Sequence, residues 1–174
     1  MKPYSKISWR ATTLCRSMER NTLKKALLIL GLSFALASTA HASCLVLGDS
    51  IATHAGLGGQ LPQCANVARQ GAPTSWIARN VPSTHYDIVY ISAGSNDWGL
   101  IQGLDARLQN LRNKVAAYEV VWILPALPGP RADVAIVSAE NHDRAVSFVA
   151  GDDHVHPKSY QALARSVLTR VAGK

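Results

Sequence analysis

Short, nearly continuous apolar runs alternate along the second part of the chain with stretches that have helical spacing. The runs lie at 44–47, 65–69, 87–94, 119–127 and 145–150. Strands that are buried on both faces have continuous apolar sequences, whereas the helices between them repeat an apolar residue every three or four positions. The sequence therefore predicts a three-layer α/β/α domain with a parallel sheet of about five strands.

Four segments between and after these runs are expected to be helical, at 75–81, 104–115, 132–145 and 157–172. The third is ambiguous because it contains several β-branched residues. The closing segment, which begins at Pro157, places one set of apolar residues on a single face: Tyr160, Leu163, Ala164, Val167 and Leu168. A turn leading into a short helix is expected from Asp49 onward.

Residues 1–42 have the order of a secretory signal peptide. Basic residues precede an apolar run at 26–37, which is too short to cross a bilayer, and an Ala-x-Ala site ends at Ala42. We expect cleavage after Ala42, with Met18 as an alternative true start. The remaining domain, 43–174, is then expected to be periplasmic or secreted, without stable insertion in the membrane.

Charge and cysteine usage both change once this leader is set aside. Most of the excess basic charge of the chain, formally +7, lies in the leader, so the domain gives no reason to expect nucleic-acid binding. Its two cysteines, Cys44 and Cys64, are candidates for a disulfide in an oxidising compartment. Two buried free thiols remain an alternative, as does a lipidated Cys44, whereas a zinc site is not indicated.

Glycine and polar residues follow four of the five expected strands. In chain order they are Gly48-Asp49-Ser50, Gly71, Gly94-Ser95-Asn96-Asp97 and Asp152-Asp153-His154-Val155-His156. The carboxyl ends of parallel strands meet at one edge of a sheet, which is where such sheets bind ligands. The four groups are therefore expected to gather at that edge.

This ordered set resembles the SGNH (GDSL-type) serine hydrolases, over about residues 44–170. The resemblance implies a flavodoxin-like fold, with Ser50 as nucleophile and with Asp153 and His156 as its catalytic partners. It also implies an oxyanion hole built from the backbone N–H groups of Ser50 and Gly71 and the side-chain amide of Asn96. The supporting motif residues are Gly48, Asp49, Gly94 and Asp97. The first motif lacks the leucine found in many members.

The chemistry of these residue types agrees with the resemblance. A serine hydroxyl needs a base to take its proton, and an imidazole oriented by a carboxylate is suited to that role. Taken singly, each motif has an ordinary alternative, since Gly-Asp-Ser, Asn-Asp and Asp-x-x-His also occur in turns and helix caps. A metal site is a further alternative, with the ligands Asp152, Asp153, His154 and His156.

Together these features predict an exported serine esterase without cofactor or metal, acting on a small acylated sugar or lipid. A short acyl group, such as acetyl on a sugar, is favoured because the chain is short. A thioesterase, a lysophospholipase or an acyltransferase would use the same acyl-enzyme, and an idle carbohydrate-binding protein would keep the same fold. Trp98 is expected either to line the substrate pocket or to pack in the core.

Overall fold

The computed structural model describes residues 43–97 and 102–169 of the chain. The expected signal peptide, its cleavage after Ala42 and the position of Trp98 lie outside these residues. Among the described helices, none combines the length and the apolar character needed to cross a bilayer.

The domain contains a five-stranded sheet in the order β2-β1-β3-β4-β5, and every neighbouring pair is parallel. The strands are β1 (Cys44–Gly48), β2 (Ala65–Ala68), β3 (Tyr86–Ser92), β4 (Ala117–Ile123) and β5 (Arg144–Val146). This is the flavodoxin-like strand order, in which the chain changes direction across the sheet beside β1. The predicted fold class is confirmed.

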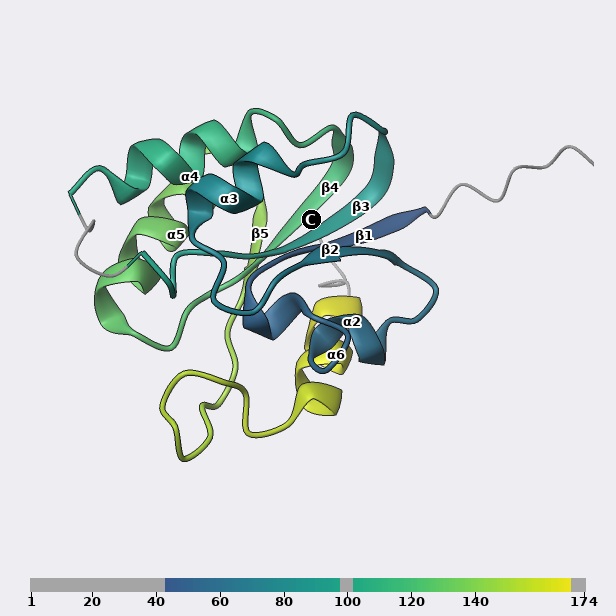
Figure 1. The fold of residues 1–174 in the computed structure, drawn as a ribbon, viewed down its shortest axis with the longest axis vertical. Coiled ribbons are helices and arrows are strands. Elements are labelled where there is room, and N and C mark those ends of the chain that lie inside the picture. The colour runs from purple at the N-terminus through teal and green to yellow at the C-terminus, as the bar shows by residue number, and fades with distance from the viewer. Residues whose placement is uncertain (1–42, 98–101, 170–174) are drawn as a thin grey trace, which may run out of the picture. The chain divides into compact units, whose positions relative to one another are not determined.

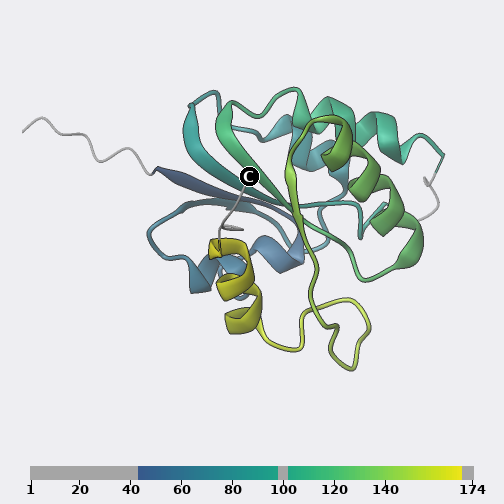
Figure 2. The same cartoon turned by 180° about the vertical axis from the view of Figure 1, so that it is seen from behind.

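Helices cover both faces of the sheet (Figures 1 and 2). One face carries α3 (Thr74–Arg79), α4 (Leu104–Arg112) and α5 (Pro128–Glu140), and the other carries η2 (Ser50–Ala52), α2 (Leu57–Gln60) and α6 (Tyr160–Leu168). Each face of the sheet has its own hydrophobic core, and neighbouring residues of one strand pack in different cores. Trp122 packs on the first face and Val121 on the second, and both are fully buried. Burial on both faces explains the continuous apolar runs.

Several elements end earlier than their sequence patterns suggest. The run at 119–127 leaves the sheet after Ile123, and Pro128 then begins α5, since a proline is well accommodated in the first turn of a helix. The last strand stops at Val146 because its partner β4 ends opposite it, at Ile123. On α6, Leu168 is 53% exposed and lies outside the buried face on which it was expected.

The expected disulfide between Cys44 and Cys64 is present. It links the first residue of β1 to the residue before β2, so it closes the connection between two neighbouring strands. In the chain-entropy model a loop of about 20 residues gives roughly 3 kcal/mol of stabilisation. Such a bond is consistent with an oxidising, extracellular location.

Candidate active site

The groups expected at the carboxyl edge of the sheet do gather there. Gly48 ends β1 and Ser92 ends β3, while Gly71 lies in the loop after β2. The long segment after β5 returns to the same edge and brings His156 to Ser50, 106 residues away in sequence. Parallel strands place these distant segments together because their connections all return to the opposite edge.

Ser50, His156 and Asp153 form a continuous hydrogen-bonded chain. Nε2 of His156 lies 2.9 Å from Oγ of Ser50, and Nδ1 of His156 lies 2.5 Å from Oδ2 of Asp153. The serine is buried, whereas the Asp153 side chain is 53% exposed. The distances fit proton transfer from the hydroxyl to the imidazole, with the carboxylate holding the other ring nitrogen.

Backbone contacts fix the loop that carries this histidine. Oδ1 of Asp153 accepts hydrogen bonds from the N–H groups of Val155, at 3.0 Å, and His156, at 2.9 Å. These bonds, and the one to the imidazole, hold the pKa of Asp153 well below its ordinary range, so the group is a carboxylate at neutral pH. The N–H of Gly151 donates to the carbonyl of His156 at 2.8 Å, and Ala150 pairs with Pro157.

Asp49 fixes the turn that presents Ser50. Its Oδ1 accepts from the N–H of Ile51 at 3.1 Å, which caps η2, and from the hydroxyl of Ser92 at 2.7 Å. Within the described ranges its Oδ2 has no hydrogen-bond partner, and the residue is fully buried. Burial raises the pKa of Asp49, although its two hydrogen bonds oppose that change.

This raised pKa makes the stability of the fold depend on pH. The folded state holds the Asp49 proton more tightly than the unfolded chain, so the group favours folding most at pH values below 3.8. That contribution is lost as the pH rises through the raised pKa. Asp49→Asn keeps an acceptor for Ile51 and Ser92 but does not titrate. We expect wild-type stability, relative to this variant, to fall as the pH rises.

Urea unfolding of the wild type and Asp49→Asn between about pH 3 and about pH 8 measures this difference. Asp152→Asn is the matched control, because Asp152 is an exposed carboxyl on the loop after β5. Its difference from the wild type should change less with pH. Parallel stability curves for the wild type and Asp49→Asn would contradict the expectation.

The three expected oxyanion donors lie on three different segments. Ser50 begins η2, Gly71 is exposed in the loop after β2, and Asn96 follows β3. Gly71 has a φ of 66°, and a Cβ added there would meet nothing within 4 Å, so the space before it is open. Nδ2 of Asn96 donates to the carbonyl of Ala72 at 3.4 Å, which links the two loops.

Asp97 connects the loop after β3 to two helices. Its Oδ2 accepts from the N–H of Thr74 at 3.1 Å and from the Thr74 hydroxyl at 2.7 Å, and its Oδ1 lies 3.4 Å from Nε of Arg107. The preceding turn is closed by a 3.4 Å bond from the Asp97 N–H to the carbonyl of Gly94. Asp97 therefore joins the loop after β3 to α3 and α4.

The sequence analysis missed two hydroxyl groups that contact the motif carboxylates. Ser92 donates to Asp49, and Thr74 donates to Asp97. The available signal for Ser92 was a lone hydroxyl at the end of an apolar strand. For Thr74 it was a hydroxyl residue after proline at a helix start. Neither signal identifies the carboxylate that the hydroxyl meets.

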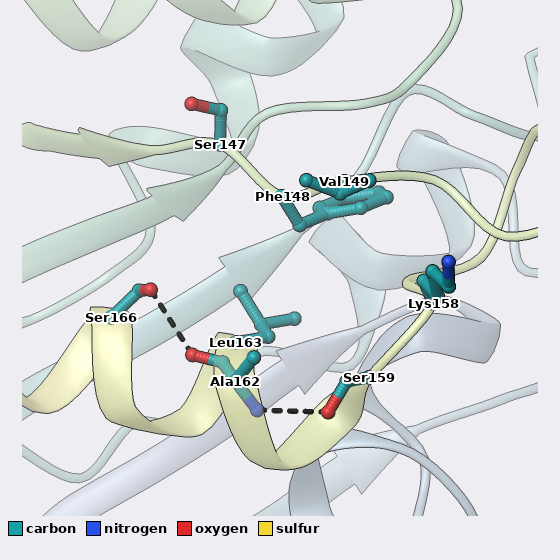
Figure 3. Close-up of a pocket in the computed structure, with 8 residues that line it drawn as sticks. All are labelled: Ser147, Phe148, Val149, Lys158, Ser159, Ala162, Leu163 and Ser166. Atoms are coloured by element: carbon teal, nitrogen blue, oxygen red, sulfur yellow. Dashed lines mark hydrogen bonds between the residues drawn. The ribbon is translucent and has the colours of Figure 1, made fainter.

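Two hollows lie beside the histidine loop. One, of about 340 Å³, is lined by Gly151, Asp152, Asp153, His156, Pro157 and Lys158. The other, of about 450 Å³, lies between the segment after β5 and α6 and is lined by Ser147, Phe148, Val149, Lys158, Ser159, Ala162, Leu163 and Ser166 (Figure 3). Neither Ser50 nor His156 lines the second hollow, so it is separate from the hydrogen-bonded chain.

The metal alternative finds no support in the arrangement of these side chains. Within residues 43–97 and 102–169, no three His, Cys, Asp or Glu side chains come close enough to hold a metal ion. The four proposed ligands on the histidine loop therefore do not converge.

No protein-family model matches the chain, and no curated protein matches it significantly.

Proposed function

We propose that this protein is a serine hydrolase that cleaves a carboxylic ester through an acyl-enzyme on Ser50, in the manner of the SGNH hydrolases that its motifs resemble. One observation carries the proposal. Ser50, His156 and Asp153 form a hydrogen-bonded chain at the carboxyl edge of a parallel sheet. Each of the three residues, taken alone, would suit a turn or a cap, but that connection gives the serine a base and the base an orienting carboxylate.

In the first half of the reaction, Oγ of Ser50 attacks the ester carbonyl carbon while Nε2 of His156 takes the hydroxyl proton. The Asp153 carboxylate accepts the hydrogen bond from Nδ1 and stabilises the imidazolium. The developing oxyanion is bound by the N–H groups of Ser50 and Gly71 and by the amide of Asn96. Collapse of this intermediate breaks the ester bond, and the departing alkoxide takes the proton from His156.

In the second half, water attacks the acyl carbon and His156 takes a proton from the water. The second tetrahedral intermediate expels Oγ of Ser50, which regains its proton from His156. The products are the free acid and the regenerated enzyme. No cofactor or metal is needed for this sequence.

The favoured substrate is a small ester with a short acyl group, such as acetyl on a sugar, and the favoured location is the periplasm or the exterior of the cell. The Cys44–Cys64 disulfide supports the location. A thioesterase, a lysophospholipase or an acyltransferase shares the same acyl-enzyme and differs in leaving group or acceptor. An idle carbohydrate-binding protein is the alternative of another class, and the pairing of Ser50 with His156 favours the enzyme.

Mass spectrometry after exposure to a fluorophosphonate tests the proposal. We expect one adduct on Ser50, absent from Ser50→Ala, and turnover of 4-nitrophenyl acetate that disappears in the same variant. A folded protein that neither labels nor turns over any ester would favour the binding protein. On the same samples, a strong preference for acyl groups of about eight carbons or more would contradict the short-acyl substrate.

A further inference from the structure

Arg69 is the first residue after β2, at the same edge of the sheet as Ser50. Its N–H donates to the carbonyl of Gly48 at 3.1 Å, and its own carbonyl accepts from the N–H of Ala72 at 3.1 Å. Its backbone is therefore anchored beside the end of β1, and the loop that it begins contains Gly71. Arg69 itself is exposed.

The guanidinium of Arg69 lies over an aromatic ring. Its Cζ lies 4.5 Å from the centroid of the Trp76 ring, and Trp76 belongs to α3 and packs against the core. A cation–π contact needs no carboxylate partner, so the N–H groups of the guanidinium can still donate to a ligand. The ring thus favours one placement of the side chain without an ion pair.

Arg69 differs in this respect from the arginines that pair with acids elsewhere in the domain. Arg107 pairs with Asp97, Arg112 with Asp143 and Arg144 with Glu119. Across the described residues, no carboxylate lies within ion-pair distance of Arg69, and no side-chain hydrogen bond engages its guanidinium. An exposed guanidinium with no acidic partner, at the same edge of the sheet as a proposed active site, is suited to bind an oxyanion on a ligand.

We propose that Arg69 binds an anionic group of the substrate, a carboxylate or a phosphate, and so selects esters that carry a negative charge. The inference rests on the proposed function, because it names the substrate class of the same site. The planar donor edge fits both kinds of group through paired hydrogen bonds, and the contact with Trp76 favours one placement of the side chain. Arg69 is in this role a specificity residue and takes no part in the proton transfers.

Matched chromogenic esters test the proposal. For the acyl side, 4-nitrophenyl butyrate is compared with 4-nitrophenyl hemisuccinate and 4-nitrophenyl 3-phosphonopropionate, which carry a carboxylate and a phosphonate. For the alcohol side, 4-nitrophenyl acetate is compared with 5-acetoxy-2-nitrobenzoate. In at least one set, the ratio of kcat/KM for the anionic ester to that for the neutral ester should fall about tenfold in Arg69→Gln, mainly through KM.

Comparing each ratio between two proteins cancels the intrinsic reactivity of the esters. Arg69→Lys keeps the charge but loses the paired donors, so its ratio should lie between those of the wild type and Arg69→Gln. Arg79→Gln is the matched control, because Arg79 is also exposed but is the last residue of α3, at the end of the helix away from the loop that Arg69 begins. The ratios of this variant should equal those of the wild type. The wild-type preference should also weaken as salt is added.

The outcomes separate this inference from the proposed function. Turnover of the neutral esters with ratios that Arg69→Gln leaves unchanged would overturn the role of Arg69 and leave the hydrolase standing. If no ester is turned over, NMR titration of Ser50→Ala with 5-acetoxy-2-nitrobenzoate still tests whether Arg69 forms an anion site. Binding that weakens about tenfold in Ser50→Ala/Arg69→Gln would support the anion site, and equal affinity would overturn it.

Discussion

Replacing His156 by Gln is expected to lower kcat/KM for a carboxylic ester by about 10⁴-fold while the domain stays folded. The imidazole contacts Oγ of Ser50 through one nitrogen and Asp153 through the other. A glutamine amide can hydrogen-bond but cannot take the hydroxyl proton and return it to the leaving group. The side chain of His156 is 33% exposed, so its loss removes little packing.

The proposed mechanism also predicts that the losses of kcat/KM caused by substitution of Ser50 and of His156 are not independent. If the two residues act as one unit, Ser50→Ala/His156→Gln should be no slower than the slower single variant. Independent effects would instead multiply. Ester turnover by the wild type, the two single variants and the double variant forms a complete cycle, with the esters of the labelling experiment as substrates.

A matched control lies on the same loop. His154 is exposed and has a φ of 57°, a backbone conformation that asparagine tolerates, so His154→Asn should leave turnover unchanged. Retention of more than about a tenth of wild-type turnover by His156→Gln would contradict a general-base role for the histidine.

The sequence was most informative about the sheet and about the segments that meet at its edge. Five apolar runs predicted five strands because strands buried on both faces cannot alternate with polar residues. Once the strands are parallel, the segments that hold Ser50, Gly71, Asn96 and His156 must lie at one edge, so their proximity follows from chain order. The resemblance implied that His156 acts on Ser50, and the structure adds the distance of 2.9 Å between the imidazole and the hydroxyl.

Side-chain contacts between different elements could not be predicted in this way. The partnership of Ser92 with Asp49 and the stacking of Arg69 on Trp76 both depend on strand register and helix placement. Element ends were missed for a related reason. The stretch 124–127 is apolar, yet it leaves the sheet because β3, the other neighbour of β4, ends at Ser92 opposite Ile123. Periodicity describes one segment at a time, whereas these features are set by its neighbours.

Gly48→Ala is expected to destabilise the domain by about 4 kcal/mol or to prevent folding. Gly48 ends β1 with a φ of 150°, and a Cβ added there would lie 2.1 Å from the carbonyl oxygen of Ser92. That oxygen is backbone of the neighbouring strand and accepts the N–H of Asp49 at 3.1 Å. Relief of the clash therefore requires β1 to move away from β3, in the middle of the sheet.

The movement would also reach the site, because Asp49 follows Gly48 and holds both Ser92 and the turn of Ser50. Urea unfolding followed by circular dichroism measures the loss, and the soluble yield measures failure to fold. Gly151→Ala is the matched control, since a Cβ on this residue would make only ordinary contacts, the nearest at 3.5 Å to the carbonyl oxygen of His156. Its unfolding midpoint should stay near that of the wild type. A Gly48→Ala protein with a wild-type midpoint would show that β1 and β3 are not held as closely as the structure has them.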